Sequence, residues 1–154
     1  LEAATEVAAF DLPSDLPRVQ AEDFSAQGGG QVQVREDKVG HDGRSISHWD
    51  NQGHWLEWKL TAPADGRYYL VLRYCSQFDN LRAATLDGAP VGSGSFRFPA
   101  TGGFSAETND WRHWALRDAS GPLALPLKSG EHILRLENRD GKGMNLDYLM
   151  LVPA

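Results

Sequence analysis

The stretch Asn138-Arg-Asp-Gly-Lys-Gly-Met-Asn-Leu-Asp-Tyr-Leu-Met-Leu-Val152 decides the fold of this chain. It opens with Asp140-Gly141 and Lys142-Gly143, which predict a turn because glycine reaches positive φ without a Cβ clash. From Met144 onward the residues alternate as in a strand, and both faces are mostly apolar. A strand that is apolar on both faces is buried on both sides, so we expect a central strand here.

Shorter runs upstream have the same period of two and are separated by turn residues about every 8–12 positions. The expected strands are Arg18–Phe24, Gln31–Arg35, Ser45–Trp49, His54–Thr61, Arg67–Cys75, Leu81–Leu86, Gly92–Pro99, Trp111–Leu116, Leu123–Leu127 and His132–Glu137. No window carries the apolar stripe of an amphipathic helix. The pattern therefore predicts an all-β sandwich of antiparallel sheets.

Length and composition limit the class of protein. A chain of 154 residues fits one domain, and its 41% apolar and 23% charged residues are typical of a globular protein. A net charge of −6 without any Lys or Arg cluster disfavours nucleic acid and anionic membrane as partners. Residues 1–17 are rich in Ala, Pro and acids, so we expect a linker or lead-in followed by one domain over 18–154.

The motifs of common enzymes are missing. No Gly-x-Ser-x-Gly elbow occurs, and His41, His48 and His54 do not have the spacing of zinc ligands. The single cysteine, Cys75, excludes an internal disulfide and lies in an apolar run, which favours a buried structural thiol. We therefore expect a protein that is not an enzyme.

Five segments together resemble a known family. They are Val19-Gln-Ala-Glu-Asp-Phe24, Gly53-His-Trp-Leu-Glu-Trp58, Gly66-Arg-Tyr-Tyr-Leu-Val-Leu-Arg-Tyr74, Gly130-Glu-His-Ile-Leu-Arg-Leu136 and Met144-Asn-Leu-Asp-Tyr-Leu149. In this order they are similar to strands of the carbohydrate-binding modules of families 6 and 35. The resemblance covers nearly the whole chain and implies a galactose-binding-domain-like β-jelly roll.

The resemblance also implies a structural Ca²⁺ where the first strand meets the last. The matching ligand positions are Gln20, Glu22 and Asp147, with Gln20 standing where these families have glutamate. Calcium takes roughly six to eight hard oxygen ligands, and a carboxamide oxygen serves as well as a carboxylate. The alternative is that Glu22 pairs with Arg18 or Arg73 while Asp147 caps the turn.

A sugar site is implied at the loop end of the sandwich. Sugars present apolar C–H faces and hydroxyl groups, so such sites pair a flat aromatic with fixed amide or carboxylate groups. The positions that match the ligand residues of these families are His48 or Trp49, Trp111 and Asn145, and Asp50 and Lys142 lie near them in the sequence. A lysine beside the site would suit an acidic sugar. Alternatively, Asn145 bonds within the turn. For Trp111 the alternative is packing in the core, where we also expect Trp58 and Trp114.

These features predict a non-catalytic carbohydrate-binding module that targets an attached catalytic domain to polysaccharide. We expect a monomer that is secreted, periplasmic or on the cell surface of a bacterium, with poly- or oligosaccharide as its ligand. The alternative is a structural or protein-interaction jelly roll without a sugar site. The family's Asp in the second motif is His54 here, which bears on the ligand rather than on the fold.

Overall fold

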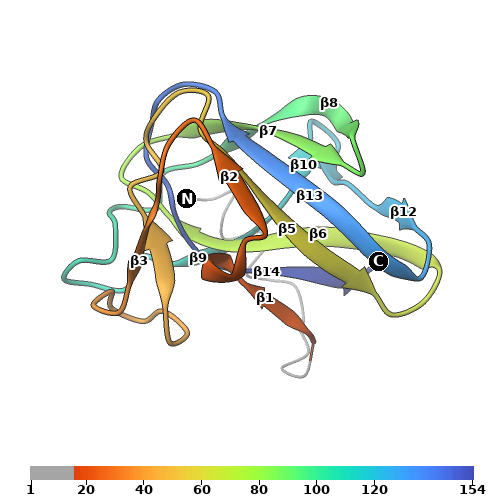
Figure 1. Cartoon of the computed structure of the whole chain (residues 1–154), viewed down its shortest axis with the longest axis horizontal. Coiled ribbons are helices and arrows are strands. Elements are labelled where there is room, and N and C mark those ends of the chain that lie inside the picture. Colours follow the sequence, from red (N-terminus) through yellow and green to blue (C-terminus); the bar gives the residue numbers. More distant parts are fainter. Residues whose placement is uncertain (1–15) are drawn as a thin grey trace.

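The computed structural model describes residues 16–154, so most of the expected lead-in over 1–17 lies outside the described residues. Two sheets face each other and enclose the core (Figure 1). All the strand pairs are antiparallel. The predicted all-β sandwich is confirmed. No helix within residues 16–154 has the length and apolar character needed to cross a membrane.

One sheet has seven strands and the other has five. The seven-stranded sheet contains β1 (Arg18–Gln20), β3 (Gln33–Arg35), β4 (Ser45–Ser47), β6 (Gly66–Cys75), β9 (Arg112–Ala115), β12 (Leu125–Leu127) and β14 (Asn145–Pro153). The five-stranded sheet contains β2 (Ala26–Gly28), β5 (Trp55–Ala62), β7 (Asn80–Leu86), β8 (Ala89–Phe98) and β13 (Gly130–Asn138). A small third sheet pairs β10 (Arg117–Asp118) with β11 (Gly121–Pro122).

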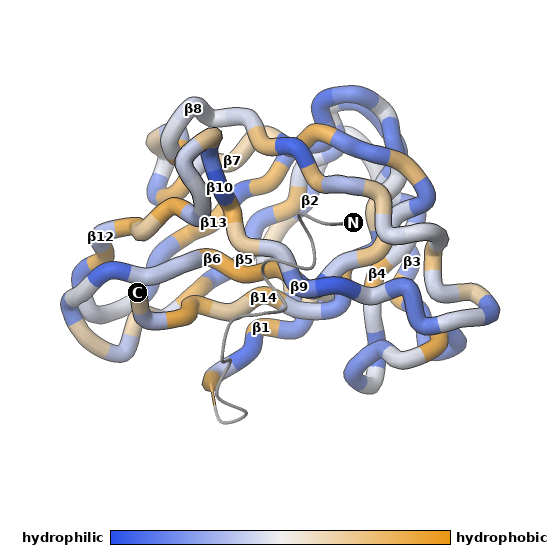
Figure 2. Tube along the Cα trace, turned by 180° about the vertical axis from the view of Figure 1, so that it is seen from behind, coloured by the Kyte–Doolittle hydropathy of each residue, from blue (hydrophilic) through white to orange (hydrophobic). Residues whose placement is uncertain are grey.

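The core lies between the two large sheets and follows the alternation of the sequence. On β5 the side chains of Leu56, Trp58 and Leu60 are buried, whereas Lys59 between them is exposed. In Figure 2 the hydrophobic colour follows β6 and β14 through the middle of the molecule. Trp58 and Trp114 are both buried in this core, as expected.

The last strand, β14, is central in its sheet. It pairs with β6 along one side and with β4 and then β1 along the other. The register against β6 shifts between Leu146 and Tyr148, so Asp147 is an extra residue that pairs with nothing across the ladder. The bulge breaks the alternation, and it lies where the neighbour of β14 changes from β4 to β1.

The expected strand Arg18–Phe24 is wrong beyond Gln20, because the chain turns there into the 3-10 helix η1 (Ala21–Asp23). Ala21 is fully buried, and its carbonyl accepts a hydrogen bond from Trp58 Nε1 at 2.9 Å. The contact fixes η1 at the point where the chain crosses from β1 in the seven-stranded sheet to β2 in the five-stranded sheet.

Strand β2 was not expected, because the run Gly28-Gly29-Gly30, which begins within it, is typical of a loop between strands. A Cβ on Gly28 would lie 2.7 Å from the Trp55 ring, and one on Gly30 would lie 2.6 Å from the His54 ring. Glycine therefore allows this segment to lie directly against β5.

Candidate functional site

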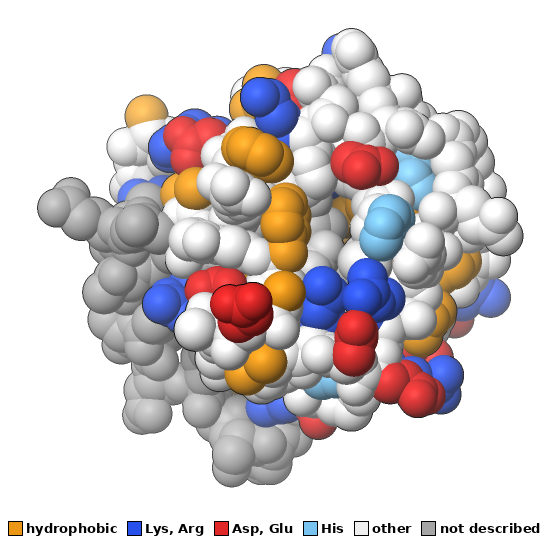
Figure 3. Space-filling view, turned by 90° about the vertical axis from the view of Figure 1, so that its left-hand side faces the viewer, with side chains coloured by type: hydrophobic (Ala, Val, Ile, Leu, Met, Phe, Trp, Pro, Cys, Tyr) orange, Lys and Arg blue, Asp and Glu red, His pale blue; other side chains and the backbone are white. Residues whose placement is uncertain are grey.

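Loops at the end of the sandwich where β14 begins form an open pocket of about 180 Å³. Its polar and charged lining residues are Arg35, Lys38, Ser47, His48, Asp50 and Asn145, and its other lining residues are Trp49, Phe104, Gly143 and Met144. Figure 3, which views this end, shows basic side chains and a histidine beside a line of hydrophobic side chains. The pocket brings together His48, Trp49, Asp50 and Asn145, four of the six residues expected at a sugar site.

His48 follows β4 in an unusual backbone conformation. Its φ is 62°, which a non-glycine residue adopts at a cost and which often marks a functional position. The imidazole is exposed, and its Nδ1 shares a hydrogen bond of 2.9 Å with the Ser47 hydroxyl. The turn therefore presents a polar ring at the mouth of the pocket, while the next residue, Trp49, is fully buried and forms its floor.

Asn145 is the first residue of β14 and is almost fully buried. Its Nδ2 donates a hydrogen bond of 3.0 Å to the carbonyl of Phe104, which lies in the loop before β9. The amide thus bonds across to another loop rather than within its own turn. It also fixes the position of Phe104, the aromatic side chain of the pocket wall.

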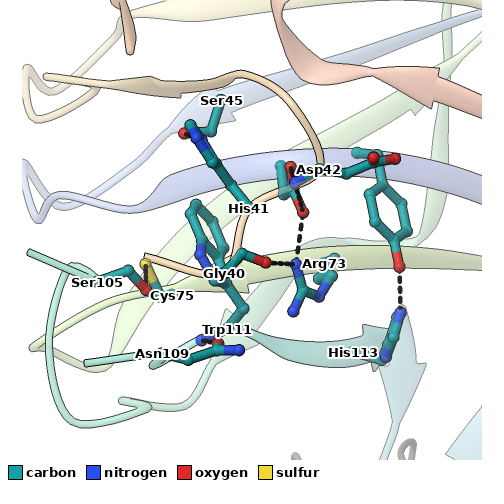
Figure 4. A network of polar contacts seen from close by, with 12 residues as sticks. Gly40, His41, Asp42, Ser45, Arg73, Cys75, Ser105, Asn109, Trp111 and His113 are labelled. Atoms are coloured by element: carbon teal, nitrogen blue, oxygen red, sulfur yellow. Dashed lines mark hydrogen bonds and ion pairs between the residues drawn. The ribbon is translucent and has the colours of Figure 1, made fainter. Parts of the chain in front are cut away.

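Trp111 does not line this pocket. Its side chain is buried, and its Nε1 donates a hydrogen bond of 2.9 Å to the carbonyl of Val39. In Figure 4 the Trp111 side chain reaches from beside Asn109 to the segment at Gly40, and the Arg73 guanidinium is 5.8 Å from the ring centroid. The polar residues before Trp111 suggested an exposed loop end, but the segment around Gly40 covers it. In this conformation no face of the ring is open to a sugar.

Lys142, the sixth expected residue, also lies outside the pocket lining. It is exposed, and its ammonium nitrogen is 5.3 Å from the centroid of the Phe78 ring. The backbone of Lys142 helps to fix its loop, because its carbonyl accepts hydrogen bonds from the buried side chains of Arg82 and Asn138.

Arg82 holds two loops of the pocket through their backbone. The guanidinium is fully buried and donates hydrogen bonds to the carbonyls of Trp49 at 2.9 Å and Lys142 at 3.2 Å. Asn138 Nδ2 donates to the same two carbonyls, at 3.1 and 3.0 Å. Burial lowers the pKa of Arg82 to about 9, against the raising effect of Asp140 and Asp50, so the group stays charged at neutral pH.

The sequence reasoning missed Arg82. A signal was present, because Arg82 lies two residues before Ala84 on a predicted strand and therefore shares its inward face. An arginine at an inward position is expected to have specific hydrogen-bond partners.

A second polar cluster lies at the bulge of β14. Asp147 is fully buried, and its Oδ2 accepts a hydrogen bond of 2.7 Å from Arg73. The backbone N–H of Asp42 donates to both carboxylate oxygens, at 3.0 and 3.2 Å. Burial raises the pKa of Asp147, and the bonds from Arg73 and Asp42 oppose that rise. Arg73 also donates to the carbonyl of Gly40, as Figure 4 shows.

The other two expected calcium ligands lie beside this carboxylate. Oε1 of Gln20 and Oε1 of Glu22 are buried oxygens without a hydrogen-bond partner. Burial raises the pKa of Glu22, and the negative charges of Asp23 and, to a smaller extent, Asp147 add to the rise. Buried acceptors that lack donors are the groups a hard cation satisfies, so these residues fit a calcium ion. Within residues 16–154, however, no three His, Cys, Asp or Glu side chains are arranged as a metal site.

The alternative ion pairs differ from the expected ones. Arg18 pairs with Asp42 at 3.1 Å and Arg73 pairs with Asp147, so neither arginine pairs with Glu22. Asp147 caps the backbone of Asp42 rather than the turn before its own strand.

The fold places the chain among known proteins. It superposes on a family 35 carbohydrate-binding module from Clostridium thermocellum with a TM-score of 0.71 and 23% identity, over 92% of this chain and 100% of that one. A family 6 module of a laminarinase from Zobellia galactanivorans gives 0.68 and 18%, over 90% and 99%. The chain has the fold of family 35 and family 6 carbohydrate-binding modules. The resemblance drawn from the five sequence segments, and the galactose-binding-domain-like sandwich it implied, are thereby confirmed.

Two further matches, one to a solved structure and one to a curated sequence, carry more sequence identity. A module of Cellvibrio mixtus lichenase 5A, solved with cellotriose, is 27% identical with a TM-score of 0.64, over 90% of this chain and 98% of that one. Among curated sequences, an exo-β-D-glucosaminidase of Amycolatopsis orientalis is 29% identical over 140 residues, which are 90% of this chain and 12% of that enzyme. The chain thus spans about an eighth of the length of this relative. No protein-family model matches the chain.

Proposed function

We propose that the chain is a non-catalytic carbohydrate-binding module that holds an attached catalytic domain close to polysaccharide. The observation that carries this proposal is the loop-end pocket, in which an aromatic side chain, an amide and several charged groups converge. The proposal is also supported by relatives of the same fold, one solved with cellobiose and one attached to a family 26 mannanase of Podospora anserina. Tethering would raise the effective concentration of the catalytic domain at its substrate.

The pocket residues suit the chemistry of a sugar. Phe104 offers an apolar surface for a C–H face, and Asn145, Asp50 and His48 offer hydrogen bonds to hydroxyl groups. Lys38 adds a positive charge that would favour a sugar with a carboxylate. Since polysaccharide is the proposed ligand, we place the protein outside the cytoplasm, in the secreted, periplasmic or cell-surface space.

The carboxylates support binding rather than catalysis. Most glycoside hydrolases use two carboxyl groups about 5–9.5 Å apart on either side of the scissile bond. Asp50 is the one carboxylate among the residues that line the described pocket. The acid pair Glu22 and Asp147 belongs to the cluster at the β14 bulge, where Asp147 is bonded to Arg73.

Retardation in native gels that contain laminarin, β-glucan, mannan, chitosan or polygalacturonate tests this function. We expect at least one polysaccharide to retard the protein, and Lys38→Ala to weaken that retardation. Lys128→Ala is the matched control, because the Lys128 side chain is 88% exposed and lies away from the pocket. If no polysaccharide retards the protein, the sandwich serves structure or protein interaction instead.

We also propose a structural Ca²⁺ held by Gln20, Glu22 and Asp147. The unpartnered oxygens of Gln20 and Glu22 support it. Such an ion would neutralise buried carboxylates and join the first strand to the last. Added CaCl₂ should raise the melting temperature relative to EDTA, and Glu22→Gln should reduce that rise. An equal melting temperature in CaCl₂ and EDTA would contradict the site, whatever the outcome of the sugar experiments.

A further inference from the structure

We infer that the binding site extends beyond the pocket onto an aromatic ledge formed by Phe104 and Phe78, which binds a second sugar unit. The inference rests on the proposed function and specifies its ligand, namely an oligosaccharide of at least two units rather than a single terminal sugar. Phe104 lines the pocket, and the centroid of Phe78 lies 6.2 Å from that of Phe104. This separation is comparable to the length of one hexose unit.

Phe78 is open to solvent at the side of the pocket. It is 44% exposed, whereas Phe96 and Phe98 in the next hairpin are buried. A single exposed apolar residue needs no explanation. Here the exposed ring touches a second aromatic that already forms the pocket wall, so the two make one continuous apolar surface. Figure 3 shows hydrophobic side chains in a line across this face.

The ledge is held in place by hydrogen bonds below it. Ser76 is fully buried, and its Oγ lies 2.8 Å from the carbonyl oxygen of Phe78 and 2.7 Å from that of Gly143, which share its one O–H donor. The same Oγ accepts a hydrogen bond of 3.1 Å from the backbone N–H of Phe78. Gly143 belongs to the pocket lining. The carbonyl of Ser76 accepts from the backbone N–H of Thr101 at 2.8 Å, near the start of the loop that carries Phe104. One serine thus joins the loops of both aromatic rings to the turn before β14.

The geometry of the two rings restricts the ligand. Their planes are inclined at 64°, so one flat sugar face cannot stack on both. Each ring must contact its own unit, and the two units must present faces that are inclined to each other. The Lys142 ammonium, 5.3 Å from the Phe78 centroid, lies at the same end and can donate hydrogen bonds to hydroxyl groups of the second unit. The ledge therefore suits a twisted chain.

The test compares sugars of increasing length by isothermal titration calorimetry. The probes are glucose with laminaribiose and laminaritriose, and galacturonic acid with its α-1,4-linked dimer and trimer, because both linkages turn successive sugar faces away from each other. In the parent protein we expect affinity to rise about tenfold from monomer to dimer in the series that binds. Phe78→Ala should remove that gain and leave the affinity for the monomer within about twofold. Leu81→Ala is the matched control, because Leu81 is also an exposed apolar residue, at 39%, and it does not line the pocket.

The outcomes separate this inference from the proposed function. Equal affinities for monomer and dimer, or an unchanged dimer affinity in Phe78→Ala, overturn the ledge and leave the pocket as the whole site. An equal loss for monomer and dimer in Phe78→Ala also overturns it, because Phe78 would then act on the pocket itself. If no probe binds, the ledge is wrong. If in addition no polysaccharide retards the protein, the proposed function is wrong as well.

Discussion

The two loop carbonyls to which Arg82 and Asn138 both donate lead to a specific prediction about the free energy of unfolding. Trp49 O and Lys142 O each accept one hydrogen bond from Arg82 and one from Asn138. Arg82→Met or Asn138→Ala alone leaves each carbonyl with one donor. The double variant removes both donors from both carbonyls.

The magnitude follows from the number of groups left without a partner. A buried polar group that loses its last hydrogen bond costs about 1–3 kcal/mol. Two such carbonyls predict that the double variant loses about 2–3 kcal/mol more than the sum of the single losses, since loop carbonyls can recover part of the cost by binding water. The two single losses also contain other bonds, including those that the N–H groups of Asp140 and Gly141 donate to Asn138 Oδ1, but these cancel in the cycle.

Urea denaturation of the four proteins, followed by tryptophan fluorescence, measures the coupling. Arg97→Met combined with Asn138→Ala is the control cycle, because the Arg97 side chain is 58% exposed and pairs with Asp79 on the surface. That control should be additive. If the Arg82 and Asn138 losses also add to within about 0.5 kcal/mol, the shared carbonyls do not connect them and the reasoning fails.

Three further predictions concern other buried groups. Burial, aided by the charges of Arg73 and Arg18, lowers the pKa of His113 from 6.5 to about 4. Between these two pH values the imidazole is therefore protonated in the unfolded chain but neutral in the folded one. The free energy of unfolding should therefore fall by up to roughly 3 kcal/mol as the pH drops through this window, and His113→Gln should remove that part of the fall in urea titrations at several pH values. Trp111→Ala should lower the free energy of unfolding by about 3–5 kcal/mol because the indole is buried; a loss below 1 kcal/mol in urea would show that the ring is open after all. Burial raises the pKa of Cys75 to about 12, so its thiol should react with a disulfide reagent only as fast as the domain unfolds, and rapid labelling of the native protein would contradict its burial.

Much of the fold could be predicted because the strands obey local rules. The alternation of β5 and the two apolar faces of β14 follow from the period of two and from burial, and both are confirmed. The site was harder. By alternation, Asn145 and Asp147 share one strand face, yet they serve the loop-end pocket and the polar cluster near β1.

The bulge at Asp147 resolves that conflict, and no local signal announces it. Its position depends on which strand pairs with β14 at each point, which is a long-range property. The burial of Trp111 has the same origin, because it is the distant segment at Val39 that covers the ring. Sequence period describes a strand well, but it does not describe which loop lies over its end.

The hydrogen bonds from Arg82 and Asn138 to the pocket loops have a consequence for engineering. They hold the loops by main-chain carbonyls, and every amino acid supplies that group. The side chains of Lys38 and Phe104, which line the pocket, make none of these hydrogen bonds. A library that randomises these positions while retaining Arg82 and Asn138 should keep a large fraction of folded members, which makes the domain a scaffold for selecting new binding specificities.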